Sequence, residues 1–151
     1  MTHPHLEPFS LIDQHGRDVA IDFSNGATLI YWYPRADTPG CIAQAESLRD
    51  NFEAFETLGC RIFGVSFDAP STNRAFRDKF RLPFDLLSDE SKGVATVQGV
   101  ATVGATVAQR VAFLVAPGGW IVHRYDVADP TLFAEHVLDD LERLDGFDIG
   151  G

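Results

Sequence analysis

Two apolar segments with a helical pattern between them constrain the fold of this chain more than any other feature. Residues 27–33 (ATLIYWY) and 60–67 (CRIFGVSF) are rich in β-branched and aromatic side chains, which is typical of strands covered on both faces. Between these segments, apolar residues recur at steps of three and four, at Ile42, Ala45, Leu48, Phe52, Phe55 and Leu58. The pattern predicts a strand, an amphipathic helix running to Gly59, and a second strand.

The remaining segments predict elements on either side of this unit. Residues 9–21 are apolar around a polar turn at 13–16, which favours a β-hairpin. Residues 110–115 and 120–125 predict a second, antiparallel hairpin with its turn at 117–119. The other expected elements are a helix that follows capping residues at 68–71 and runs to about Phe80, an extended segment at 81–87, a short helix from Ser88 or Asp89 toward Val97, a loop at 98–107, and a closing helix that begins at Asp129 and Pro130.

This order of elements predicts a single α/β domain over residues 1–151 with a thioredoxin-like fold. A central mixed β-sheet is expected to be flanked by helices, because βαβ crossovers cover the faces of a sheet. The first hairpin is expected to form an N-terminal extension. A chain of 151 residues is long enough to bury a core without disulfides, and it shows no internal repeat or linker.

The charge of the chain excludes several classes of partner. Its formal net charge is −10, and its 12 Lys and Arg residues form no basic run, so neither a nucleic acid nor an anionic membrane is an expected partner. The N-terminus has no basic and apolar signal pattern, and no apolar run approaches the roughly 20 residues of a membrane-spanning helix. We therefore expect a cytoplasmic protein.

The segment 33–41 (YPRADTPGC) places Cys41 in the first turn of the expected helix. Free backbone N–H groups and the helix dipole favour an anion there, and the thiolate is the reactive form of cysteine. Pro39 suits the first helical position, Gly40 allows a substrate to approach the backbone, and Thr38 can cap the helix or donate to an oxygen-bearing substrate. By itself, a cysteine in this position is more often a buried packing residue.

The wider pattern favours a reactive thiol. The spacing Pro34-x-x-x-Thr38-x-x-Cys41 resembles the Pro-x-x-x-Thr/Ser-x-x-Cys signature of the peroxiredoxins, the AhpC/TSA type, and the form Tyr-Pro-x-x-Asp-Thr-Pro-Gly-Cys resembles most closely the bacterioferritin comigratory protein or peroxiredoxin Q subgroup. Three further segments extend the resemblance over almost the whole chain, at 64–68 (GVSFD), 82–89 (LPFDLLSD) and 110–115 (RVAFLV).

This resemblance implies a thiol-dependent peroxidase that reduces hydrogen peroxide or organic hydroperoxides through a cysteine sulfenic acid. It implies that Cys41 is the nucleophile, that Thr38 hydrogen-bonds the substrate oxygen, that Arg110 stabilises the thiolate and the transition state, and that Pro34 shields the pocket. No metal and no organic cofactor is expected. Two further residues are expected to bind substrate, Gly40 and Tyr33.

The chain departs from the subgroup in its second cysteine. The resolving cysteine commonly lies five residues after the first, where this chain has Glu46, and residues 90–97, which carry it in some relatives, contain none. Cys60 follows the far end of the expected helix, roughly 25 to 30 Å from Cys41 at about 1.5 Å per residue, whereas a disulfide needs Cα atoms within about 7 Å. We interpret Cys60 as a packing residue and expect a one-cysteine cycle with an external thiol reductant: thioredoxin, glutaredoxin or a low-molecular-weight thiol.

Other functions stay open at this point. A peroxide-sensing, redox-regulated binding protein with little turnover is the main alternative, and an inert structural relative is another. A disulfide oxidoreductase is disfavoured because Gln44, and not a second cysteine, stands three residues after Cys41. We expect a monomer or a weak homodimer, and the sequence leaves the preferred peroxide and the reductant open.

Overall fold

The structure, a computed structural model, describes residues 4–146. In this part of the chain seven strands form one sheet in the order β2-β1-β5-β4-β3-β6-β7. The strands are β1 (Phe9–Ile12), β2 (Asp18–Ile21), β3 (Ala27–Trp32), β4 (Cys60–Ser66), β5 (Asp85–Ser88), β6 (Val111–Ala116) and β7 (Trp120–Asp126). The helices are α1 (Pro39–Asp50), α2 (Phe52–Thr57), α3 (Pro70–Phe80), α4 (Gly93–Gln98), the 3₁₀ turn η1 (Pro130–Leu132) and α5 (Phe133–Gly146).

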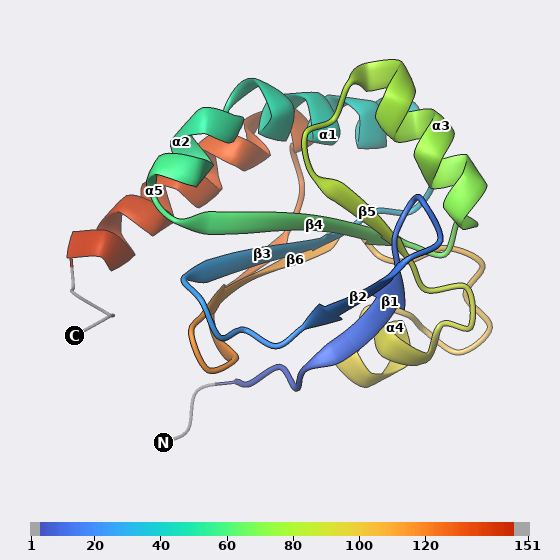
Figure 1. Cartoon of the computed structure of the whole chain (residues 1–151), viewed down its shortest axis with the longest axis horizontal. Coiled ribbons are helices and arrows are strands. Elements are labelled where there is room, and N and C mark those ends of the chain that lie inside the picture. Colours follow the sequence, from blue (N-terminus) through green and yellow to red (C-terminus); the bar gives the residue numbers. More distant parts are fainter. Residues whose placement is uncertain (1–3, 147–151) are drawn as a thin grey trace.

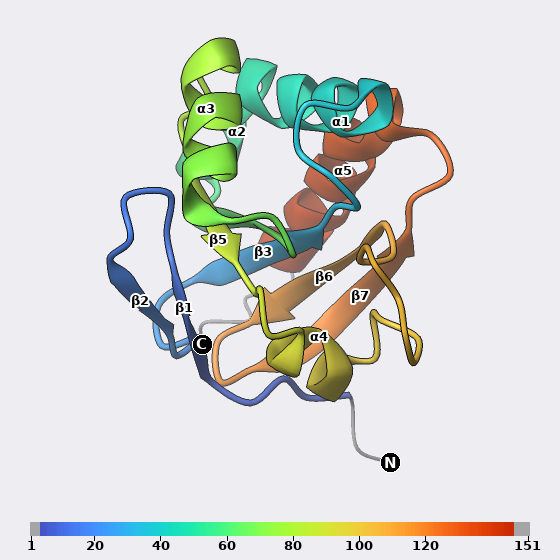
Figure 2. The same ribbon diagram turned by 90° about the vertical axis from the view of Figure 1, so that its right-hand side faces the viewer.

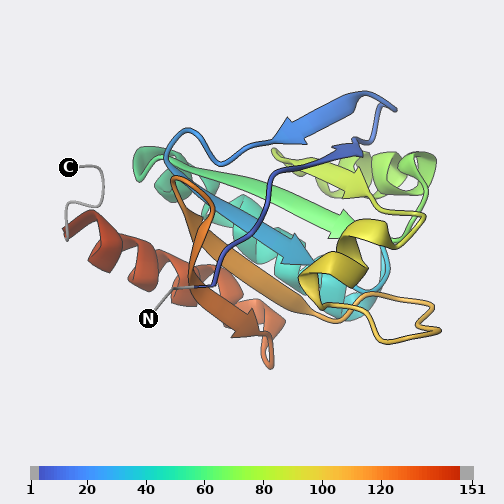
Figure 3. The same cartoon turned by 90° about the horizontal axis from the view of Figure 1, so that it is seen from below.

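The sheet is mixed, as the sequence predicts. Strands β3, β4 and β5 are parallel, while β6 and β7 continue the sheet antiparallel beyond β3, and the β1–β2 hairpin adds antiparallel strands beyond β5. Helices α1, α2, α3 and α5 cover one face of the sheet (Figures 1 and 2). Helix α4 and the segment before β1 lie on the other face (Figure 3). None of the helices in the described residues is long and apolar enough to cross a membrane.

Successive side chains from β3 onward point to opposite faces of the sheet and so belong to two different core clusters. Tyr31 and Tyr33 belong to the core cluster under α1, α3 and α5, whereas Ile30 and Trp32 belong to the cluster on the α4 face. All six residues of β3 are buried, which is why this segment is apolar without alternation in the sequence.

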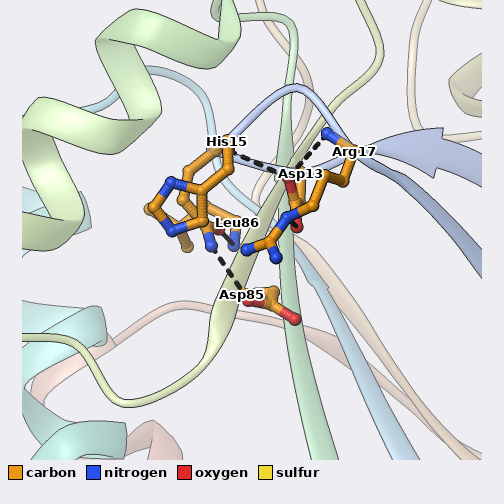
Figure 4. A network of polar contacts seen from close by, with 6 residues as sticks. Asp13, His15, Arg17, Asp85 and Leu86 are labelled. Carbon is orange, nitrogen blue, oxygen red and sulfur yellow. Dashed lines mark hydrogen bonds and ion pairs between the residues drawn. The ribbon is translucent and has the colours of Figure 1, made fainter.

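The N-terminal hairpin is fastened to the sheet by its polar turn (Figure 4). One carboxylate oxygen of Asp13 accepts the backbone N–H groups of His15 and Arg17, each at 2.9 Å. The side chain of Gln14 accepts from Leu86 N at 2.9 Å and donates to Asp85 at 3.0 Å. Strand β1 pairs with β5 only at Ile12 and Ser88, and farther along β5 the Gln14 side chain makes the hydrogen bonds instead.

The structure departs from one predicted element and refines two others. The helix predicted to run to Gly59 is interrupted at Asn51, whose side chain donates to Ser47 O at 2.8 Å, and α2 begins at the next residue. Thr38 precedes α1 but makes no side-chain cap. The closing helix begins with a 3₁₀ turn, although Asp129 does accept from the backbone N–H of Thr131. Both predicted hairpins and the loop before Arg110 are confirmed.

Candidate active site

Cys41 lies where β3 leads into α1. The chain leaves β3 after Trp32, turns through residues 33–38 and enters α1 at Pro39, so Cys41 occupies the first turn. The residue is 1% exposed, and both cysteines are free. The backbone N–H groups of a helix start have no partner within the helix and favour a negative charge nearby.

Arg110 provides the cation beside this sulfur. It directly precedes β6, the antiparallel neighbour of β3, and this pairing brings it back to the start of α1. Its Nη1 donates to Cys41 Sγ at 3.5 Å and to Gln44 Oε1 at 2.9 Å. The structure therefore brings together Cys41 and Arg110, two of the residues that the sequence singles out.

Gln44 is a site residue that the sequence reasoning missed. It is fully buried one helical turn after Cys41, and it holds Arg110 in place through its carbonyl oxygen. Its Nε2 has no hydrogen-bond partner among the residues that the structure describes. The helical spacing of three residues would have placed it on the same side of α1 as Cys41.

A steric constraint, which the sequence did not indicate, explains why residue 40 is a glycine. A Cβ added at this position would lie 2.7 Å from Arg110 Nη2. The absence of a side chain therefore lets the guanidinium pack against the first turn of α1. The substrate contact expected for Gly40 stays a prediction.

Thr38 is partly exposed beside the first turn, and its hydroxyl donates to Arg35 O at 2.7 Å. Its proton is thereby used, and its oxygen is left as an acceptor for a donor such as a hydroperoxide O–H. Pro34 is half-buried in the same turn. Tyr33, expected at the substrate, is fully buried in the core and donates to Asn73 Oδ1 at 2.5 Å.

Cys60 lies at the other end of the sheet from Cys41. It pairs with Ala27 at the start of β3, whereas Cys41 follows the end of that strand. Six residues of strand at about 3.3 Å each separate these ends by roughly 20 Å. Burial raises the pKa of the Cys60 thiol to about 12.

The described residues hold no group of three or more His, Cys, Asp or Glu side chains that could bind a metal ion. The structure places the Arg110 guanidinium and the amide of Gln44 beside the Cys41 sulfur, and the Thr38 hydroxyl in the turn before α1.

Comparisons with known proteins agree with this geometry. Residues 4–124 match the AhpC/TSA family. Peroxiredoxin Bcp of Escherichia coli is 40% identical over 125 residues, covering 78% of this chain and 80% of that protein. Chloroplastic peroxiredoxin Q of Gentiana triflora is 37% identical over 115 residues, covering 75% of this chain and 53% of that protein. The chain thus spans about half the length of the plant relatives it matches.

Solved structures show the same fold. Peroxidoxin BcpB of Mycobacterium tuberculosis superposes with a TM-score of 0.88 at 25% identity, covering 94% of this chain and 96% of that one. A peroxiredoxin Q of Xanthomonas campestris superposes with a TM-score of 0.86 at 23% identity, covering 95% and 98%. The thioredoxin-like fold predicted from the sequence is confirmed, and the chain belongs to the AhpC/TSA family of peroxiredoxins.

Proposed function

We propose that the protein is a thiol-dependent peroxidase that reduces hydrogen peroxide or organic hydroperoxides to water or an alcohol. The observation that carries this proposal is the contact of Arg110 Nη1 with Cys41 Sγ at the N-terminus of α1. Two sources of positive potential then act on one buried sulfur, and both can stabilise the negative charge that moves from sulfur to oxygen during attack on a peroxide. Its peroxiredoxin relatives support the proposal, and alkyl peroxide reduction activity is ascribed to the bacterioferritin comigratory protein of Xanthomonas campestris, whose fold this chain shares.

In the proposed reaction the Cys41 thiolate attacks the terminal oxygen of the peroxide. A sulfur–oxygen bond forms while the oxygen–oxygen bond breaks, so Cys41 becomes a sulfenic acid and the leaving alkoxide or hydroxide takes a proton to give alcohol or water. Negative charge moves from sulfur to oxygen in this step. Arg110 and the first N–H groups of α1 stabilise this charge, and Thr38 accepts a hydrogen bond from the peroxide.

We further propose that an external thiol completes the cycle. Glu46, at the position of the common resolving cysteine, is paired with Arg49 at 3.6 Å, and Cys60 is at the far end of β3. A first external thiol would displace water from the sulfenic acid and form a mixed disulfide. A second thiol would release Cys41 as the thiol and leave the reductant as a disulfide. The cytoplasmic location is likewise a proposal, supported by the free thiol of Cys41, since a cycle that uses an external thiol needs a compartment that keeps thiols reduced.

Intact mass after addition of one equivalent of hydrogen peroxide with a sulfenic-acid trap tests the proposal. We expect the trap on the wild type and on Cys60→Ser, and not on Cys41→Ser. Turnover with thioredoxin, glutaredoxin and a small thiol then identifies the reductant. A protein that reacts once and is not regenerated by any thiol would instead be the peroxide sensor, and a Cys41–Cys60 disulfide would contradict the one-cysteine cycle.

A further inference from the structure

The turn that carries Pro34 and Thr38 is not held by regular secondary structure. Asp37 within it has a φ of +59°, in the left-handed region that residues other than glycine adopt at an energetic cost. Thr38 makes no side-chain cap on α1. Within the turn the Thr38 hydroxyl donates to Arg35 O, and the rest of its backbone depends on groups outside it to keep one shape.

Asp68 is the group that fixes it from the interior side. Its Oδ2 accepts the backbone N–H of Ala36 at 2.9 Å, in the middle of the turn. The same oxygen accepts the hydroxyl of Ser66 at 2.9 Å, and Ser66 Oγ lies 3.2 Å from the backbone N of Asp68. The carboxylate is thereby held at the end of β4, next to the end of β3.

A fully buried side chain, Asn73 of α3, continues this network. Its Oδ1 accepts the hydroxyl of Tyr33 at 2.5 Å and lies 3.4 Å from Ser66 Oγ, and its Nδ2 donates to Ser88 Oγ at 3.1 Å. These bonds tie the ends of β3, β4 and β5 to α3. Buried polar groups that satisfy one another in this way make a rigid support.

A second contact to the turn is weaker. Lys79 at the end of α3 pairs with Asp37 at 3.0 Å, but both side chains are largely exposed. Exposed ion pairs contribute little to stability, because solvent screens them. Asp68 is therefore the member of this network whose removal changes the turn most directly.

We propose that Asp68 is a positioning residue of the peroxide site. By binding Ala36 N–H it sets the path of the turn into Thr38 and Pro39, and hence the place of Cys41 against Arg110. Asp68 itself does not contact the sulfur or the peroxide. This inference rests on the proposed peroxidase function and names a group on which that function depends.

The test compares Asp68→Ala, Asp68→Asn and the control Asp78→Ala. Asp78 lies on the surface of α3, where its carboxylate is 3.9 Å from Arg74, so its removal changes the charge equally without reaching the turn. We expect the rate constant for oxidation of Cys41 by hydrogen peroxide to fall about tenfold in Asp68→Ala, since small displacements of reacting groups cost rate steeply. Asp68→Asn should stay within about threefold of wild type, because its amide oxygen still accepts from Ala36 and Ser66.

Alkylation of Cys41 by iodoacetamide should change in the opposite direction. Cys41 is 1% exposed, so a loosened turn should make it more accessible in Asp68→Ala and increase its alkylation rate. If Asp68 only stabilised the fold, its removal would lower the midpoint of thermal unfolding. In the folded protein, peroxide reactivity would then not fall while the alkylation rate rises. Both rates are therefore measured well below that midpoint.

Three results would overturn the inference: an Asp68→Ala rate close to wild type, an Asp68→Asn rate as low as that of Asp68→Ala, or unchanged alkylation. If Asp68→Ala does not fold, Ser66→Ala removes one of the two donors to Oδ2 and should show the same pair of opposite changes at about threefold. If the wild type itself forms no sulfenic acid, the peroxidase proposal fails, and the alkylation rates still decide whether Asp68 holds the turn.

Discussion

Arg110 Nη1 lies 3.5 Å from the sulfur of Cys41, although 69 residues separate the two in the chain. The contact exists because β6 runs antiparallel to β3, so the residue before β6 meets the helix that follows β3. A bond between such distant segments survives only in the folded sheet. The reactivity of Cys41 is therefore expected to depend on the sheet as well as on the local helix start.

Replacement of Arg110 by alanine should lower the rate constant of Cys41 with hydrogen peroxide by about 100-fold, because a group that stabilises developing negative charge is typically worth that much. Arg110→Lys should recover little, since an ammonium group lacks the planar guanidinium whose Nη1 reaches both Sγ and Gln44 Oε1 while its Nη2 packs against Gly40. Stopped-flow oxidation by hydrogen peroxide, with Cys41 as the single cysteine of each protein, measures both rate constants. Arg124→Ala, on exposed β7, is the control, and an equal loss there would argue for a general charge effect.

Gln44 should matter through Arg110. In Gln44→Glu a carboxylate replaces the acceptor of Arg110, so its negative charge competes with the reacting sulfur for the guanidinium and should lower the rate constant of Cys41 with hydrogen peroxide. Gln44→Ala should lower peroxide reactivity severalfold, because Arg110 loses the bond that orients it. Stopped-flow oxidation by hydrogen peroxide measures the rate constant of Cys41 in each variant. Equal rate constants in wild type and Gln44→Glu would contradict this role.

Gly40→Ala tests the close packing of Arg110 on α1. The new methyl group would lie 2.7 Å from Nη2, which forces the guanidinium to move. We expect about a tenfold loss of peroxide reactivity with little loss of stability, because the end of a long side chain can shift. Gly93→Ala is the matched control: it is also a glycine at a helix start, and its added Cβ would meet only Ser91 Oγ at 3.3 Å. Wild-type reactivity of Gly40→Ala would show that Arg110 is not held as described.

The sequence predicted the parts of this site that depend on local pattern. An apolar run, a turn and an amphipathic helix placed Cys41 in the first turn of α1, and the structure confirms this. Arg110 was found only by resemblance, because no periodicity relates the start of β6 to the start of α1. The spacing of three residues after Cys41 was enough to place Gln44 on the same side of α1. It was missed because position 44 was considered only as the place where a redox pair would have its second cysteine.

Other features have no signal that a single sequence reveals. The bond between Asp68 and Ala36 N joins residues 32 apart, through a side chain and a backbone group in an irregular turn. The interruption at Asn51 was missed because Phe52 and Phe55 keep the apolar spacing across it, so the pattern of burial continues where the helix does not. Tertiary packing decides such details, and local propensity does not.

Cys60 should be unreactive at neutral pH and should make stability depend on pH in the alkaline range. Its folded-state pKa is raised to about 12 by burial, whereas an unfolded cysteine ionises near about 8.5. Between these values the unfolded chain loses a proton that the folded chain keeps, so the free energy of unfolding falls as pH rises, by at most about 1.4 kcal/mol per unit.

Denaturant unfolding of wild type and Cys60→Ala at about pH 8 and about pH 10.5 measures this effect. Burial also raises the pKa of Tyr31, Tyr33 and Tyr125, and these groups are present in both proteins. The charge of Cys60 contributes to the raised pKa of Tyr125, so the difference between the two proteins reports Cys60 together with its effect on Tyr125. Cys60→Ala should be less stable at the lower pH, through the lost packing of the sulfur, and that deficit should shrink at the higher pH. Its rate with peroxide should equal that of wild type, because Cys60 lies at the opposite end of β3 from Cys41. A constant difference in stability across the pH range would mean that Cys60 ionises as readily in the folded chain as in the unfolded one.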